Sequence, residues 1–241
     1  MDLSDLFDGY SRQARLQPAL LALFPLFVTV AVWVPALYDF AAGLIGLATA
    51  CGAVVYLAHV ARALGRKAES RLYDAWGGKP TTHWMMHGDR NLDPQTKARY
   101  HAFLSDNVTG WIAPSPDDEA KDPRAAEATY DSAVRWLRER TRDRKRYGLV
   151  FKENVSYGFR RNLYGLKPIG LTLALLCVAG NVGTLYHAVF VAGGPIPPPG
   201  VASLALSLVA VAGWLWVVRQ SWVRDGADGY ARALLAACDA E

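Results

Sequence analysis

Three charge-free stretches dominate the pattern of apolar and polar positions along the chain. Residues 18–38 and 40–61 contain no Asp, Glu, Lys or Arg, and residues 168–218 contain none either. A helix needs roughly 20 predominantly apolar residues to cross a bilayer, so each of the first two stretches can form one span. The third is long enough for two, and Pro197-Pro198-Pro199 divides it because consecutive prolines cannot continue a helix. The pattern predicts four transmembrane helices arranged as two hairpins. Long core helices of a soluble protein would rarely run this far without a charge.

All basic residues lie on one side of these predicted spans. The connections within the two hairpins hold no Lys or Arg, whereas residues 1–17, 62–167 and 219–241 carry all 26. The positive-inside rule then places both termini and the long middle segment in the cytoplasm. We therefore expect a bacterial inner-membrane protein with this order: a cytoplasmic N-terminal helix at 1–17, a first hairpin at 18–61, a cytoplasmic domain at 62–167, a second hairpin at 168–218 and a cytoplasmic tail at 219–241. A cleaved signal peptide is disfavoured because Asp2, Asp5 and Asp8 precede the first apolar stretch.

The middle segment, residues 62–167, is predicted to be mainly helical. Its first part continues the second span until Gly77-Gly78-Lys79-Pro80. Further helices are expected to start at Pro94 and Pro123, because each proline follows an Asp that can cap a helix. The second of these is predicted to run to about Arg146. Glycines at 148, 158 and 165 are expected to interrupt the chain beyond it, and residues 148–151 are the best short candidate for a strand. The predicted fold class is an all-α membrane protein with a mainly helical cytoplasmic insertion.

Whole-chain averages conceal this segregation of charge. Net charge is +4 and 52% of residues are hydrophobic, while mean hydropathy is only +0.08. The apolar content excludes a disordered chain, and three cysteines in 241 residues exclude a disulfide scaffold. Cys51 and Cys177 fall within predicted spans and Cys238 in the tail, so no disulfide is expected.

The predicted helix from Pro123 to Arg146 carries the strongest charge asymmetry. On a helical wheel, five basic residues share an arc of roughly 100°. They are Arg135, Arg138, Arg142, Lys145 and Arg146. Tyr130, Val134 and Leu137 lie opposite. The basic face has three interpretations: a solvated face near anionic lipid headgroups, a site for a nucleotide or oligonucleotide, or an interface with an acidic partner protein.

A second cluster lies shortly before the third span. Tyr157, Arg160 and Arg161 recur at helical spacing, so an aromatic ring and guanidinium groups share a surface. Such groups can stack on bases and bind phosphate, or they can anchor a helix at the headgroup level. Both interpretations stay open for these three residues, whereas for Tyr164 and Lys167 we favour the role of anchor at the headgroup level.

Other chemistry finds little support. His83 and His87 are spaced i, i+4, near Asp89 and His101, but Trp84 occupies the position that a zinc-protease motif gives to Glu. No catalytic, metal or cofactor motif is evident, so we do not expect an enzyme.

A few polar residues lie inside the predicted spans. Asn181 and Thr184 can hydrogen-bond between helices, and Ser203 and Ser207 form a small-residue pair. These four are candidates for helix packing or, around an oligomer axis, for a pore face.

The layout of two hairpins with a long cytoplasmic insertion, together with the stretches 135–146 and 153–162, resembles a known group. This group is the small four-transmembrane effectors of bacterial anti-phage nucleotide-signalling systems, such as the SMODS-associated CBASS effectors and Hailong-type membrane effectors. The resemblance implies that a nucleotide or oligonucleotide binds the cytoplasmic part and opens or disrupts the inner membrane. The chain would then be a homo-oligomeric pore, with a tetramer favoured. The alternative is a non-conducting membrane scaffold whose basic surface binds anionic lipids or an acidic partner.

Overall fold

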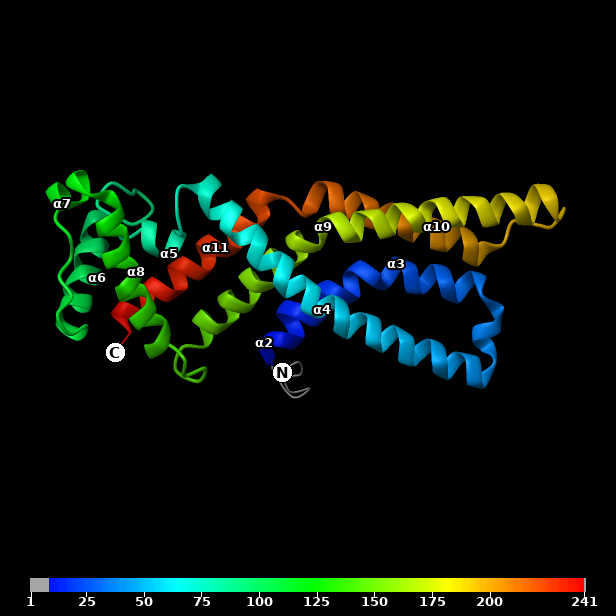
Figure 1. The fold of residues 1–241 in the computed structure, drawn as a ribbon, viewed down its shortest axis with the longest axis horizontal. Helices are drawn as coiled ribbons and strands as arrows, with labels where there is room; N and C mark the ends of the chain where they lie inside the picture. The colour runs from blue at the N-terminus through cyan, green and yellow to red at the C-terminus, as the bar shows by residue number, and fades with distance from the viewer. Residues whose placement is uncertain (1–8, 241) are drawn as a thin grey trace. The chain divides into compact units, whose positions relative to one another are not determined.

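A computed structural model describes residues 9–240, and every regular element among them is helical (Figure 1). The α-helices are α2 (Gly9–Ser11), α3 (Gln17–Trp33), α4 (Phe40–Trp76), α5 (Pro80–His83), α6 (Pro94–Asn107), α7 (Pro116–Lys121), α8 (Pro123–Arg140), α9 (Gly148–Tyr186), α10 (Pro198–Ala212) and α11 (Gln220–Leu235). π-helical turns cover Arg12–Leu16, His187–Val191 and Gly213–Val217, and short 3₁₀ turns cover Pro35–Tyr38 and Ala236–Asp239.

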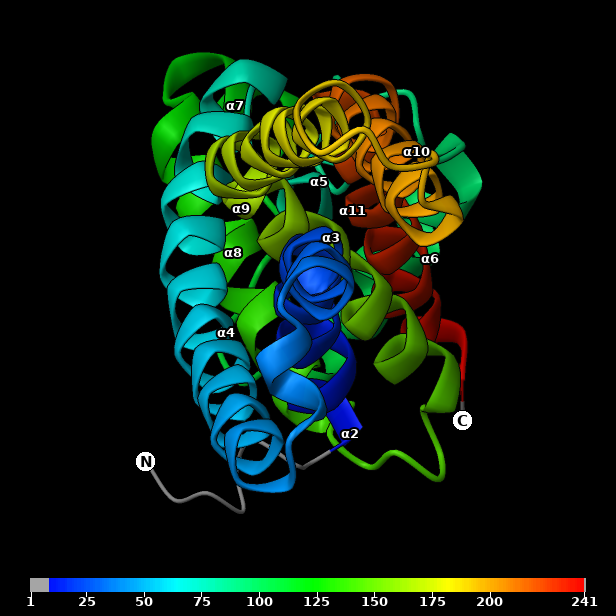
Figure 2. The same ribbon diagram turned by 90° about the vertical axis from the view of Figure 1, so that its right-hand side faces the viewer.

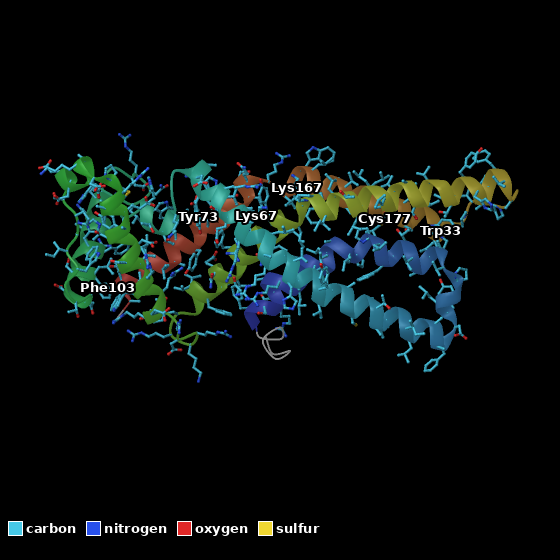
Figure 3. All side chains as sticks on the ribbon, in the orientation of Figure 1. Trp33, Lys67, Tyr73, Phe103, Lys167 and Cys177 are labelled. Atoms are coloured by element: carbon cyan, nitrogen blue, oxygen red, sulfur yellow. The ribbon has the colours of Figure 1, made fainter. Side chains whose placement is uncertain are left out.

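Four helical stretches are long and apolar enough to cross a membrane. They are Gly9–Trp33, Phe40–His83, Gly148–Val191 and Pro198–Val217. The prediction of an all-helical chain with four candidate spans is therefore confirmed for the part of the chain that the structure describes. These spans carry few nitrogen or oxygen atoms along their apolar stretches (Figure 3).

The chain forms two compact units, which are described separately below. The first unit consists of residues 9–69 and Gly158–Val223, and it contains the apolar stretches of α3, α4, α9 and α10. Viewed along these helices, α3 lies between α4 and α10 (Figure 2). Its core includes Ala22, Ala58, Leu166 and Trp214. The apolar stretch of α4 is an exception, because only 6% of it is buried compared with 22–28% for the other three spans.

The second unit consists of Ser70–Tyr157 and residues 224–240. Its core is built from large side chains of α6, α8 and α11, with Leu104, Tyr130, Leu137 and Leu234 fully buried or nearly so. Asp93 caps α6 as predicted, accepting hydrogen bonds from the backbone N–H groups of Gln95 and Thr96. The carboxylate of Asp122 likewise accepts the backbone N–H of Ala125 and caps α8.

Some local predictions are confirmed and others are wrong. α4 continues past its apolar stretch to Trp76 and ends at Gly77 and Gly78, whose positive φ angles of 81° and 143° suit glycine. The predicted strand at 148–151 is wrong, because these residues begin α9. The glycines at 158 and 165 do not interrupt α9, which is continuous from Gly148 to Tyr186. The predicted helix at 1–17 is described only from residue 9 onward, where it is helical; residues 1–8 lie outside the described part of the chain.

Candidate functional site

The basic helix predicted from 123 to 146 ends earlier than expected. α8 stops at Arg140, and the Oγ1 of Thr141 donates back to the carbonyl of Leu137. The carboxylate of Asp143 then accepts the backbone N–H of Lys145, which fixes a turn before α9. Arg142, Lys145 and Arg146 are therefore not on the helix that carries Arg135 and Arg138. The single basic face of the sequence prediction is replaced by a helix end followed by a turn.

We call residues 138–146 the basic turn. It contains six basic side chains, all exposed: Arg138, Arg140, Arg142, Arg144, Lys145 and Arg146. Glu139 neutralises one of them, because its carboxylate lies 2.7 Å from the Nη2 of Arg142. Among the residues that the structure describes, the other five form no ion pair. Like charges at this density repel one another, so an anion that bound here would relieve the repulsion.

Aromatic rings support several of these guanidinium groups. Arg140 lies over the rings of Trp136 and Phe103, at 5.3 and 5.5 Å from their centroids. Arg144 lies 4.3 Å from the centroid of Phe151. A cation–π contact orients a guanidinium without neutralising its charge. The positive charge of the basic turn is thus partly pre-positioned and still available to an anion.

Arg135 is held differently from its neighbours on α8. Its guanidinium lies 2.9 Å from Asp131, whose other oxygen lies 2.8 Å from the Nζ of Lys79. Partial burial opposes ionisation of Asp131, but the two cations outweigh it and hold the pKa of this carboxyl below its usual value. Arg135 is therefore engaged in a local network and is a weaker candidate for ligand binding than the basic turn.

Tyr157 belongs to the second unit, but its side chain faces inward. It is buried, its hydroxyl lies 3.1 Å from the hydroxyl of Tyr73, and its ring stacks parallel to that of Tyr230. A base could stack on Tyr157 only if these contacts were broken. The structure therefore gives this residue a packing role.

Arg160 and Arg161 belong to the first unit, so the structure does not group them with the basic turn. Arg160 donates to the carbonyl of Trp222 at 2.9 Å and lies over its ring. Arg161 lies 2.8 Å from the carboxylate of Glu69 and also donates to the Oδ1 of Asn162. Both side chains make contacts within the first unit, and these contacts would have to be broken before either guanidinium could bind a phosphate in full.

The polar residues of the spans form one network inside the first unit. Asn181, which is fully buried, accepts a hydrogen bond from the Nε1 of Trp33 at 2.8 Å and donates to the hydroxyls of Thr29 and Ser207. Ser203 is also buried, 3.3 Å from Thr29. These contacts join α3, α9 and α10 within one chain, which supports the packing interpretation of Asn181, Ser203 and Ser207.

Thr184 lies outside this network. Its hydroxyl donates to the carbonyls of Gly180 and Asn181 in its own helix. It therefore forms no hydrogen bond to another helix among the described residues.

Glu119, Tyr130 and His101 form a buried polar cluster that the sequence did not reveal, and the backbone of the exposed His87 joins it. The carboxylate of Glu119 accepts the backbone N–H of His87 and the hydroxyl of Tyr130, the latter at 2.7 Å. His101 bonds the carbonyl of Met85 through Nε2 and stacks on the Tyr130 ring. Burial lowers the pKa of His101, and burial with the Glu119 hydrogen bond raises the pKa of Tyr130. The acidic, proline-rich stretch at residues 113–119 thus includes a buried anchor, Glu119.

This cluster is not arranged as a metal site. The Nε2 of His87 lies 3.0 Å from the carbonyl of Pro114, and His83 lies 3.9 Å from Asp89. No group of three His, Cys, Asp or Glu side chains among the described residues could hold a metal ion.

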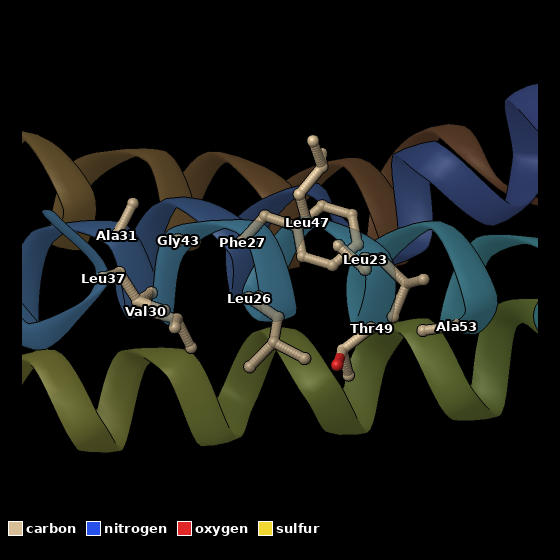
Figure 4. A pocket seen from close by; sticks show the side chains of 12 residues that line it. Leu23, Leu26, Phe27, Val30, Ala31, Leu37, Gly43, Leu47, Thr49 and Ala53 are labelled. Carbon is tan, nitrogen blue, oxygen red and sulfur yellow. The ribbon is translucent and has the colours of Figure 1, made fainter. Parts of the chain in front are cut away.

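An open groove of about 470 Å³ separates part of α3 from α4 (Figure 4). Leu23, Phe27 and Leu47 are typical of its lining. Its one lining hydroxyl, that of Thr49, donates to the carbonyl of Ile45 in the same helix. The groove offers no charged group to an anionic ligand.

Four candidate transmembrane helices place the chain among multi-pass membrane proteins. Comparison with protein-family models, curated proteins and solved structures found no match. The interpretation of the site therefore depends on its own geometry.

Proposed function

We propose that this protein is an oligomeric inner-membrane effector or ion channel, gated by an anionic nucleotide or oligonucleotide and acting in anti-phage defence. In this proposal α3 with α4 and α9 with α10 form two membrane hairpins. Both termini and residues 62–167 are cytoplasmic, as the distribution of basic residues favours. A homo-tetramer is favoured because it would present four basic turns around one axis.

The observation that carries the proposal is the basic turn. Arg138 and Lys145 are exposed and, within the described part of the chain, have no acidic partner. Guanidinium groups bind phosphate oxygens through two parallel hydrogen bonds, and Lys binds them as a point charge. A ligand with several phosphates would engage several of these side chains at once.

The chain offers a route from ligand to membrane. α9 begins at Gly148, two residues after Arg146, and contains the third candidate span. A ligand that binds one conformation of the turn more tightly than another shifts the protein toward that conformation. The proposed gating needs only this difference in affinity, provided that the change in the turn also moves the start of α9.

The test combines binding with leakage from vesicles. The full chain is reconstituted in dye-filled vesicles and exposed to cyclic dinucleotides, short linear RNA and DNA oligonucleotides, and pyrophosphate. We expect at least one probe to bind and release dye, and the paired change Arg138→Glu with Lys145→Glu to weaken binding about tenfold or more. Arg124→Glu is the matched control, because Arg124 is exposed on the first turn of the same helix. The proposal fails if no probe causes leakage and the paired change leaves toxicity in cells unaltered.

A second candidate function is a non-conducting scaffold that binds anionic lipids. The observation that favours it is Leu149, which is 62% exposed on the first turn of α9, directly beside the basic turn. Basic and apolar side chains together suit a membrane surface, where each cation contributes about 1 kcal/mol. This function predicts vesicle binding that weakens with salt, depends on Leu149, and proceeds without leakage under any nucleotide.

A further inference from the structure

A second apolar groove lies between α3 and α10 in the first unit. It encloses about 300 Å³. Phe24 and Pro25 of α3 form one wall, and Leu206 and Val217 lie along the other. Gly213 lines the groove where a side chain would otherwise fill it, since a Cβ built there meets no atom within 4 Å.

The groove is long and apolar. Its lining extends from Leu206 to Val218, about 18 Å at 1.5 Å per residue. An extended hydrocarbon chain can contact such a surface along its whole length, with its carbon atoms about 3.5–4 Å from those of the lining. The groove therefore suits a single extended hydrocarbon chain.

One end of the groove is positively charged. Val218, at this end, accepts a hydrogen bond from the Nζ of Lys167 at 2.7 Å (Lys167 is labelled in Figure 3). Two further N–H donors remain on this ammonium group. Arg219 follows Val218 directly and is exposed. Over the described residues, neither Lys167 nor Arg219 forms an ion pair. One cation thus contacts the last lining residue of an apolar groove, and a second follows that residue in the sequence, where the charge-free stretch stops.

We propose that this groove binds one phospholipid with an anionic headgroup. One acyl chain lies along Phe24 and Gly213, and the headgroup phosphate contacts Lys167 and Arg219. The complementarity of charge identifies the occupant, because a zwitterionic headgroup would bring a second positive charge to the same place. Anionic lipids are abundant on the cytoplasmic leaflet, the side on which the basic residues are predicted to lie. This site shares no residue with the basic turn and is independent of the proposed function.

The experiment measures lipid binding by native mass spectrometry on the full chain in detergent, with phosphatidylglycerol and phosphatidylcholine as probes. Wild-type protein should hold one phosphatidylglycerol about tenfold more tightly than phosphatidylcholine. Gly213→Leu should weaken phosphatidylglycerol binding about tenfold by filling the groove, and Ala210→Leu provides a second filling variant. Arg219→Gln should reduce the preference for phosphatidylglycerol.

Two controls match these variants. Gly183→Leu adds the same side chain to α9, where a Cβ also meets no atom within 4 Å, but outside the groove. Arg66→Gln removes an exposed charge from α4 in the same unit. Both should bind lipid as wild type does. Equal affinity for the two lipids, or unchanged binding in both groove-filling variants, would overturn the proposal. So would an equal loss in the controls.

Discussion

Gly165→Ala tests a close approach of the backbones of α4 and α9. A Cβ added at Gly165 would lie 2.5 Å from the backbone nitrogen of Gly65 and 2.7 Å from the carbonyl carbon of Leu64. Because both neighbours are backbone atoms, the two helices must separate by about 1 Å to restore a carbon contact distance. Overpacking of this kind costs about 1–3 kcal/mol, and a rigid backbone neighbour places this site near the upper end. Replacing a helical glycine by alanine raises the free energy of unfolding by about 1 kcal/mol through helix propensity. We expect Gly165→Ala to lower the free energy of unfolding by about 2 kcal/mol.

The assay is reversible unfolding of the purified chain in mixed micelles, followed by circular dichroism. Gly180→Ala is the matched control, since it lies in the same helix and its Cβ would meet no atom within 4 Å. This control should gain up to about 1 kcal/mol from helix propensity alone. The two variants should therefore differ by about 3 kcal/mol. If Gly165→Ala proves as stable as Gly180→Ala, the close approach of the two helices is refuted.

Two further predictions concern buried polar groups. Asn181→Leu should lower the free energy of unfolding by about 1–2 kcal/mol in the same assay, because Trp33 and its other partners lose their hydrogen bonds within the apolar bundle. Thr184→Val breaks hydrogen bonds only within its own helix and should cost much less. Equal costs of the two variants would contradict the hydrogen-bond network. Burial lowers the pKa of His101, so the unfolded state binds a proton more readily and stability falls as pH drops below about 6.5. His101→Gln should flatten this pH dependence of the unfolding midpoint and His83→Gln should not; a slope that survives His101→Gln would locate its origin elsewhere.

The sequence predicted most of what depends on local pattern. The length of the charge-free stretches was enough to predict four candidate spans, and an Asp before a Pro was enough to predict where α6 and α8 begin. The predicted end of α8 was wrong because basic residues continue with helical spacing beyond Arg140, whereas the chain itself turns at Asp143. Gly158 and Gly165 looked like interruptions for a related reason: propensity disfavours glycine in a helix, but tertiary packing overrides it.

The site was harder to predict because its contacts are distant in sequence. Arg161 meets Glu69 across 92 positions, and Tyr157 meets Tyr73 across 84. No periodicity in the sequence reveals such pairs. Residues that make internal contacts in the structure therefore could not be distinguished, from the sequence, from residues that are exposed. The buried role of Glu119 was hidden in the same way, within an acidic stretch rich in proline.

The weak burial of α4 has a mechanical consequence. Near its first turns a Cβ at Gly43 would lie 2.8 Å from the carbonyl of Leu37, and further along Gly65 meets Gly165, so the helix is closely held at both of these points. From Gly43 to Ala53 it lines the groove beside α3, and its buried core residues begin at Leu57 and Ala58. Lateral pressure and bilayer thickness therefore meet the least packing resistance between Gly43 and Ala53, which makes this part of α4 the segment of the first unit most responsive to the physical state of the surrounding lipid.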